Sequence, residues 1–266
     1  METSTNPILP PDLEREIFET AALQNRRHIH LHPLLFVCRR VYRWIEPFLY
    51  RVLPVLSPRG PRFLAFYYKP ATFKQESLRH VWVDDRVSTP AMIALLSECP
   101  RLQSFCFDGP RLPPELLPLL DTMQIQNLSI RFDSHAMFPR SMFLSVTHLE
   151  LVGMTDGWAN LALLPVLTHL SLSEIYSGRP PTLDHCIHLQ AVVINFHDWA
   201  VARCFEERLL LQPDPRMVVR MVREVFNFEE WEKWAWGEDN YWSRADAFLA
   251  RKRRGEIKGS CYLLEH

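Results

Sequence analysis

The feature of this sequence that most constrains its fold is an apolar triplet that occurs six times between residues 78 and 194. In each triplet, two residues separate the first apolar residue from the second, and one separates the second from the third. The triplets are Leu78/Val81/Val83, Leu102/Phe105/Phe107, Ile125/Leu128/Ile130, Val146/Leu149/Leu151, Leu167/Leu170/Leu172 and Leu189/Val192/Ile194. Their first residues are 24, 23, 21, 21 and 22 residues apart. This near-constant spacing predicts units of one strand and one return segment that bury their apolar sides against each other.

Such a period is typical of leucine-rich-type repeats. Chance is the alternative, because 47% of the residues are hydrophobic, but regular spacing favours a real repeat. The leucine-rich pattern also places Asn or Cys eight residues after the first apolar residue. The residues at those positions are instead Arg86, Pro110, Asp133, Met154, Ile175 and His197. We therefore expect an α/β fold with an irregular, weakly curved leucine-rich-repeat-like solenoid.

Charge and cysteine content restrict the classes of partner and compartment. The chain has 30 basic and 31 acidic residues, so no long-range field would concentrate nucleic acid or an anionic membrane. No apolar run approaches the length that spans a membrane. The six cysteines form no CxxC pair and no apolar signal segment follows Met1. These features predict reduced thiols in a cytoplasmic or nuclear protein.

Several elements around the triplets can be placed from local patterns. Residues 48–56 alternate enough to form a first strand, and residues 217–222 could supply a last one. The clearest return helix runs from Thr89 to Glu98, with Pro90 at its first position and an apolar stripe facing the core. Residues 115–123 and 158–164 are shorter candidates.

Side chains alternate along a strand, so residues beside the last two triplet positions should point to the concave face of the array. They are Trp82, Asp84, Asp108, Arg131, His148, Glu150 and His169. Exposed Trp and Arg often anchor protein interfaces, which makes Trp82 and Arg131 the first candidates for contact with a protein substrate. Each could instead be an ordinary solvated surface residue.

The C-terminal segment is rich in aromatic residues. The cluster contains Phe226, Phe228, Trp231, Trp234, Trp236 and Trp242, and a helix should begin near Asp239 or Asn240. A terminal repeat usually needs a cap, so we expect this segment to cover the open end of the array. The alternative is an aromatic peptide-binding pocket.

Motifs of catalysis and cofactor binding are missing from the sequence. It contains no GxGxxG, GxxxxGK[ST] or GxSxG motif. His28, His30 and His32 alternate as metal ligands on a strand might, but no Cys or carboxylate beside them completes a tetrahedral set. We expect no catalytic residues, no cofactor and no metal.

The first fifty residues have helical patterns. Leu13, Ile17 and Ala21 recur at four-residue steps after Pro11, which suits a first helical position. A second apolar series contains Cys38, Val41, Tyr42, Ile45 and Leu49. Pro47 should end or kink its helix near Ile45. Because residues 24–32 are polar, the helix between these two should begin late, near Pro33.

The ordered motifs Leu9-Pro10-x-Asp12-Leu13, Ile17-Phe18, residues 37–44 (VCRRVYRW) and residues 46–51 (EPFLYR) resemble an F-box, as found in fungal F-box proteins with leucine-rich-type repeats. The resemblance covers about fifty residues. It implies a surface that docks on the Skp adaptor of a cullin-based ubiquitin ligase. That surface would contain Leu9, Pro10, Leu13 and Ile17, with Val37, Cys38 and Val41 on it or just beneath it. The alternative is that these residues only form a three-helix core.

We therefore expect three regions: an F-box-like helical unit (5–50), an irregular leucine-rich-type array (51–225) and a C-terminal cap with a basic helix (226–266). The resemblance implies a non-catalytic substrate receptor of an SCF-type (Skp-cullin-F-box) ubiquitin ligase. Its partners would be the Skp adaptor, through it a cullin, and an unknown protein substrate bound on Trp82, Asp84, Asp108, Arg131, His148 and Glu150. The alternative is an interaction scaffold that uses the same face and joins no ligase.

Overall fold

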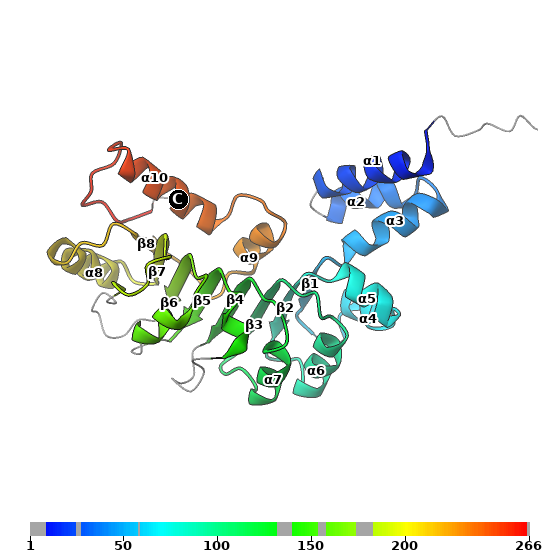
Figure 1. The fold of residues 1–266 in the computed structure, drawn as a ribbon, viewed down its shortest axis with the longest axis horizontal. Coiled ribbons are helices and arrows are strands. Elements are labelled where there is room, and N and C mark those ends of the chain that lie inside the picture. Colours follow the sequence, from blue (N-terminus) through cyan, green and yellow to red (C-terminus); the bar gives the residue numbers. More distant parts are fainter. Residues whose placement is uncertain are drawn as a thin grey trace, which may run out of the picture.

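The computed structural model describes residues 9–24, 28–57, 59–131, 140–153, 158–173 and 183–264. It shows an α/β fold with an open, eight-stranded parallel sheet, a helical unit beside β1 and two C-terminal helices over one face of the sheet (Figure 1). No helix in the described ranges is long and apolar enough to cross a membrane.

The N-terminal unit consists of α1 (Pro11–Gln24), α2 (His28–Leu35) and α3 (Arg39–Leu49). Its buried centre contains Ala22, Leu31, Val41 and Ile45. Two expected boundaries are wrong: α2 begins five residues before Pro33, and α3 continues through Pro47. Each proline removes only one backbone donor near the end of its helix, and burial of the apolar residues of this unit offsets that loss.

The strands follow each other in the sheet in the same order as in the chain. They are β1 (Val52–Val55), β2 (His80–Asp84), β3 (Ser104–Asp108), β4 (Asn127–Arg131), β5 (His148–Val152), β6 (His169–Ser173), β7 (Ala191–Phe196) and β8 (Met217–Met221). The predicted last strand is confirmed. The first strand is shorter than expected, because residues 48 and 49 belong to α3.

The triplets are aligned across the sheet, as their spacing predicts. Their middle residues pair in register from Val81 in β2 through Leu128 and Leu149 to Val192 in β7. Every triplet residue is buried and belongs to one continuous core. The triplets therefore mark buried positions of strands that share one interior.

Backbone hydrogen bonds give the strand starts a regular pattern. The carbonyl of Arg51 accepts from the N–H groups of Arg79 and His80, each at 3.0 Å. The same double acceptance recurs at Arg79, Gln103, Gln126, Thr147 and Thr168. Six consecutive steps between strands are thus fixed by main-chain bonds, which depend little on the side chain at each position.

The connecting segments between strands cover the face of the sheet that carries the triplet residues (Figure 1). We call it the first face and the opposite one the second face. They are α4 (Pro61–Tyr67), α5 (Ala71–Ser77), α6 (Thr89–Ser97), η1 (Pro114–Leu116), α7 (Leu117–Leu120), η3 (Ser141–Phe143), η4 (Trp158–Leu163) and α8 (Trp199–Leu211). The predicted helix after β2 is confirmed as α6, which buries Met92, Leu95 and Leu96. Its N-cap is Ser88, so Pro90 takes the second helical position and not the first one expected from the sequence.

The C-terminal helices are α9 (Phe228–Ala235) and α10 (Tyr241–Arg253). The expectation that they cap the open end of the array is wrong: they lie over the second face of the sheet (Figure 1). The open edge of β8 is instead occupied by the last described residues. The N–H of Val219 donates to the carbonyl of Tyr262 at 2.7 Å, and the N–H of Leu264 donates to that of Val219 at 2.8 Å. We call residues 222–261 the C-terminal lid.

Candidate functional site

The N-terminal unit exposes most of the apolar side chains that the resemblance assigns to an adaptor. Leu9, Leu13 and Ile17 are 42%, 48% and 54% exposed, although apolar residues of one helix face are usually buried. Pro10 and Cys38 are also exposed, and Val37 is 54% exposed. Such a concentration of exposed apolar side chains is typical of an interaction site.

The outcome differs for two further residues of this unit. Val41 is completely buried between the three helices, which agrees both with a position just beneath the docking surface and with the core alternative. Phe36 is 85% exposed and was missed by sequence reasoning, although an apolar residue directly after Leu34 and Leu35 was the available signal. An ion pair between Arg40 and Glu14 joins the start of α3 to α1, close in sequence to Phe36 and Leu13.

On the second face of the sheet, the alternation of side chains is as predicted but their exposure is not. Trp82 is only 2% exposed. Its ring meets those of Phe226, Phe228 and Trp231 edge to face, with centroids 6.2, 5.5 and 5.6 Å away. The expected exposure of Trp82 is therefore wrong, because α9 and the segment before it cover this part of the face.

A pair of histidines lies beneath α10. The rings of His148 and His169 stack with centroids 4.3 Å apart, and Trp242 meets both edge to face. Nε2 of His169 lies 3.1 Å from the carboxylate of Asp246. Burial lowers the pKa of His148 to about 3, and the neighbouring His169 adds to this effect. His148 is therefore neutral here at physiological pH.

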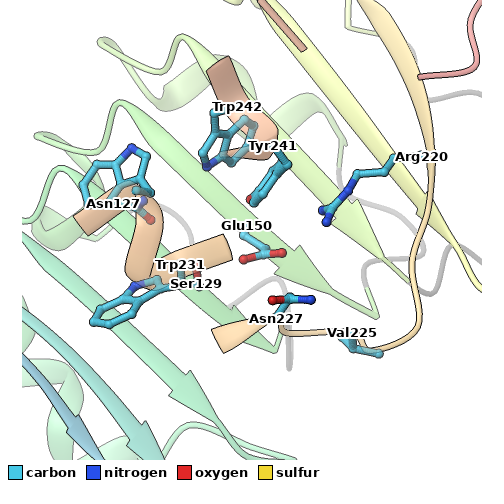
Figure 2. Close-up of a pocket in the computed structure, with 10 residues that line it drawn as sticks. Asn127, Ser129, Glu150, Arg220, Val225, Asn227, Trp231, Tyr241 and Trp242 are labelled. Atoms are coloured by element: carbon cyan, nitrogen blue, oxygen red, sulfur yellow. The ribbon is translucent and has the colours of Figure 1, made fainter. Parts of the chain in front are cut away.

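The centre of the covered face is polar. Figure 2 shows Glu150, Arg220 and Tyr241 around one small cavity. The lid residues Asn227, Trp231, Trp234 and Trp242 also line it. The cavity gives the centre of a water molecule about 10 Å³, which is room for about one water. Glu150 is only 7% exposed in this conformation, so its predicted contact with a substrate would need the lid to move.

Burial changes the ionisation of this centre. It raises the pKa of Glu150 to about 7, against the opposing effects of a hydrogen bond with Ser129 and the charge of Arg220. It also raises the pKa of Tyr241 well above its usual range and lowers the pKa of Arg220. The carboxyl group is therefore partly protonated near neutral pH.

Two polar groups in this centre are incompletely matched. The guanidinium of Arg220 lies over the ring of Tyr241, 4.6 Å from its centroid, but it has no hydrogen bond or ion pair with any residue that the structure describes. The amide nitrogen of Asn195 donates to the hydroxyls of Ser171 and Ser173 at 2.8 and 3.0 Å. The amide oxygen of Asn195 is buried with no partner in the described part of the chain.

The remaining predicted substrate residues lie at the carboxyl ends of β2 to β4 and are accessible. Asp108 is exposed, and Asp84 and Arg131 are partly exposed. Asp84 pairs with Arg86 at 2.7 Å. Burial and the charges of Asp84 and Asp85 raise the pKa of Asp108, while Arg131 opposes the rise. The predicted face is thus divided into an accessible rim and a covered centre.

Sequence reasoning missed Arg220 and Tyr241 as part of this centre. A single arginine inside the apolar strand Met217–Met221 was a signal, because an isolated charge in a buried strand is uncommon. The signal for Tyr241 and the tryptophans was their number, which indicated burial but not the surface that they cover.

Neither the models of protein families nor the curated proteins give a match for this chain.

Proposed function

We propose that this protein is the substrate-recognition subunit of an SCF-type ubiquitin ligase. The observation that carries the proposal is the exposed apolar surface of the N-terminal unit, formed by Leu9, Pro10, Leu13, Ile17, Phe36, Val37 and Cys38. These residues include six of the seven that the F-box resemblance assigns to the adaptor. An amphipathic helical unit that leaves its apolar side uncovered is suited to docking on a partner.

In this proposal the sheet with its aligned triplets is an irregular leucine-rich-type array that presents a protein substrate. The accessible rim with Asp84, Asp108 and Arg131 is the part of the array that a substrate can reach in this structure. The protein contributes binding, and the other subunits of the ligase supply ubiquitin transfer. Such a receptor would work in the cytoplasm or the nucleus.

The test is co-purification of the full chain with a Skp-type adaptor after the double substitution Pro10→Ala and Leu13→Ala. Hot-spot side chains typically contribute about 2 kcal/mol or more each, and about 1.4 kcal/mol is a tenfold change, so we expect adaptor binding to fall by about a thousandfold. The matched control is Leu210→Ala with Leu211→Ala on α8, whose leucines are 54% and 82% exposed. Adaptor binding that survives the first pair unchanged would exclude the proposed contact surface.

The alternative function is a protein-interaction scaffold that never joins a ligase. Exposed apolar residues outside the N-terminal unit favour it: on α8, Trp199, Leu210 and Leu211 are 54%, 54% and 82% exposed. If the protein is such a scaffold, the unaltered chain should not bind the Skp adaptor. The variant with Leu210→Ala and Leu211→Ala should then lose binding to the scaffold's own partner.

A further inference from the structure

The contact between the C-terminal lid and the sheet has two kinds of surface. Near β2 and β3 it is apolar, with Trp82 and Cys106 against Trp231 and Trp236. Near β7 and β8 it is apolar again, with Val193 and Val218 against α10. The same face also carries the polar residues Glu150 in β5, Asn195 in β7 and Arg220 in β8, which form the polar centre.

The polar centre is poorly matched by what covers it. Side chains that are permanently buried are normally apolar or fully hydrogen-bonded, because an unmet polar group costs on the order of 1–3 kcal/mol. Here the indoles of Trp234 and Trp242 line the cavity beside Arg220, whose guanidinium contacts only the ring of Tyr241 among the described residues, and the amide oxygen of Asn195 on the same face is buried without a partner in the described part of the chain. The lid therefore covers a surface that could make better polar contacts than those it has now.

The polar contacts between the lid and the face include a side-chain hydrogen bond between Tyr241 and Ser171. Nε1 of Trp231 donates to the hydroxyl of Ser104 at 3.1 Å, and His169 lies 3.1 Å from the half-exposed Asp246. Both ends of the lid are anchored by β8, which ends at residue 221 and bonds to residues 262 and 264. The helices between these anchors could lift without breaking any bond between strands of the sheet.

We propose that the C-terminal lid is an intramolecular occupant of a binding face, and that the face receives a protein segment with two aromatic anchors once the lid lifts. The aromatic anchors follow from what the face binds now: Trp231 lies against Trp82, and Trp242 against the stacked pair of His148 and His169. A hydrogen-bond acceptor on the segment would also reach Arg220. The inference rests on the proposed function, since the segment would belong to the substrate.

The cysteines allow lid opening to be measured on the full chain. Cys106 lies on the covered face, Cys99 lies in the core on the opposite face, and Cys38 is exposed. Burial raises the pKa of Cys99 to about 12 and that of Cys106 well above its usual range, so neither thiol reacts while it is covered. Alkylation by iodoacetamide in native buffer, read by mass spectrometry, reports each exposure separately.

We expect Cys106 to be alkylated more slowly than Cys38 but at least tenfold faster than Cys99. Trp231→Ala should raise the Cys106 rate at least tenfold, and the milder Asp246→Ala should raise it severalfold, while the Cys99 rate stays the same. Glu207→Ala on α8 is the matched control for loss of an exposed carboxylate and should change neither rate. Equal rates for Cys106 and Cys99 in the unaltered chain and in Asp246→Ala would overturn the proposal, because only global unfolding would then expose the face.

The nature of the occupant is tested with a synthetic peptide of residues 226–249 of this chain. Added to the Trp231→Ala or Asp246→Ala variant, it should slow alkylation of Cys106, because it refills the face. The same peptide with alanine in place of Trp231 and Trp242 should give no protection. Equal protection by both peptides, or none by either, would contradict the assignment of aromatic anchors. Neither assay contains the adaptor, so the outcome is independent of whether the N-terminal unit binds it.

Discussion

Two titratable side chains on β5 respond to pH in opposite directions. The pKa of His148 is lowered to about 3 from 6.5, so the folded state loses stability as the pH falls below 6.5. The pKa of Glu150 is raised from 4.5 to about 7, so the folded state loses stability as the pH rises from 4.5 to 7. Over this shared range the two effects oppose each other.

Glu150→Gln should reveal the contribution of Glu150. Glutamine keeps the shape and a hydrogen bond to Ser129 but cannot ionise, so the variant avoids the cost of a buried carboxylate. A shift of this size corresponds to up to about 3 kcal/mol. We expect the variant to exceed the unaltered chain in unfolding free energy at pH 8 and to differ little at pH 4.5, as measured by urea denaturation.

His148→Asn is the complementary variant. Because it lacks the imidazole, this variant should have a higher unfolding free energy than the unaltered chain at pH 4.5 but not at pH 7.5. For the Glu150→Gln variant, the contradicting result would be a difference in unfolding free energy from the unaltered chain that is the same at all pH values. Glu150 would then not titrate within the covered centre.

At the scale of elements, the position of the lid depends on how α10 begins. The side chain of Asn240 accepts from the N–H groups of Trp242 and Ser243, and the hydroxyl of Ser243 accepts from the N–H of Asn240 in return. This capping box begins the helix just before Tyr241 and Trp242, which both face the sheet.

Asn240→Ala should lower the unfolding free energy by about 1 kcal/mol, because two backbone donors lose their side-chain acceptor. The control is Ser88→Ala at the start of α6, where the serine makes no side-chain cap bond, so a change well below that of Asn240→Ala is expected. Urea denaturation followed by far-ultraviolet circular dichroism gives both values. Equal losses in the two variants would show that the capping box does not stabilise α10.

At the scale of the whole molecule, one core connects all eight strands. Residues from Leu53 in β1 to Val219 in β8 belong to the same apolar cluster on the first face. Each strand pairs only with its neighbours in sequence, so stability passes along the sheet through nearest-neighbour contacts. A cavity in the middle should therefore weaken the sheet as a unit.

Leu128→Ala in β4 tests this cooperativity. Loss of a completely buried leucine side chain should lower the unfolding free energy by about 2–5 kcal/mol. The urea transition followed by circular dichroism should coincide with the exposure of Cys99. Cys99 follows α6 in the chain and belongs to the shared core. Leu210→Ala, which alters a 54% exposed leucine, should stay within about 0.5 kcal/mol of the unaltered chain. Two separate transitions would mean that the sheet is not one cooperative unit.

Local patterns predicted much of the fold. The triplets predicted the buried strand positions, Pro90 marked the beginning of α6, and Asn240 marked that of α10. The failures also have local causes: Pro33 and Pro47 were given too much weight against the burial of Leu31 and Ile45, which depends on contacts between helices. The exposed residues of α1 were identified through the F-box resemblance.

The sequence by itself determined which side chains share each face of the sheet, because strand alternation and a constant period are local properties. Only the tertiary structure decided what covers the second face. Trp82 and Trp231 are far apart in the chain, and no spacing indicates that they meet; their contact arises from packing in three dimensions. That packing makes the substrate face predicted from the sequence a covered, polar centre with an accessible rim.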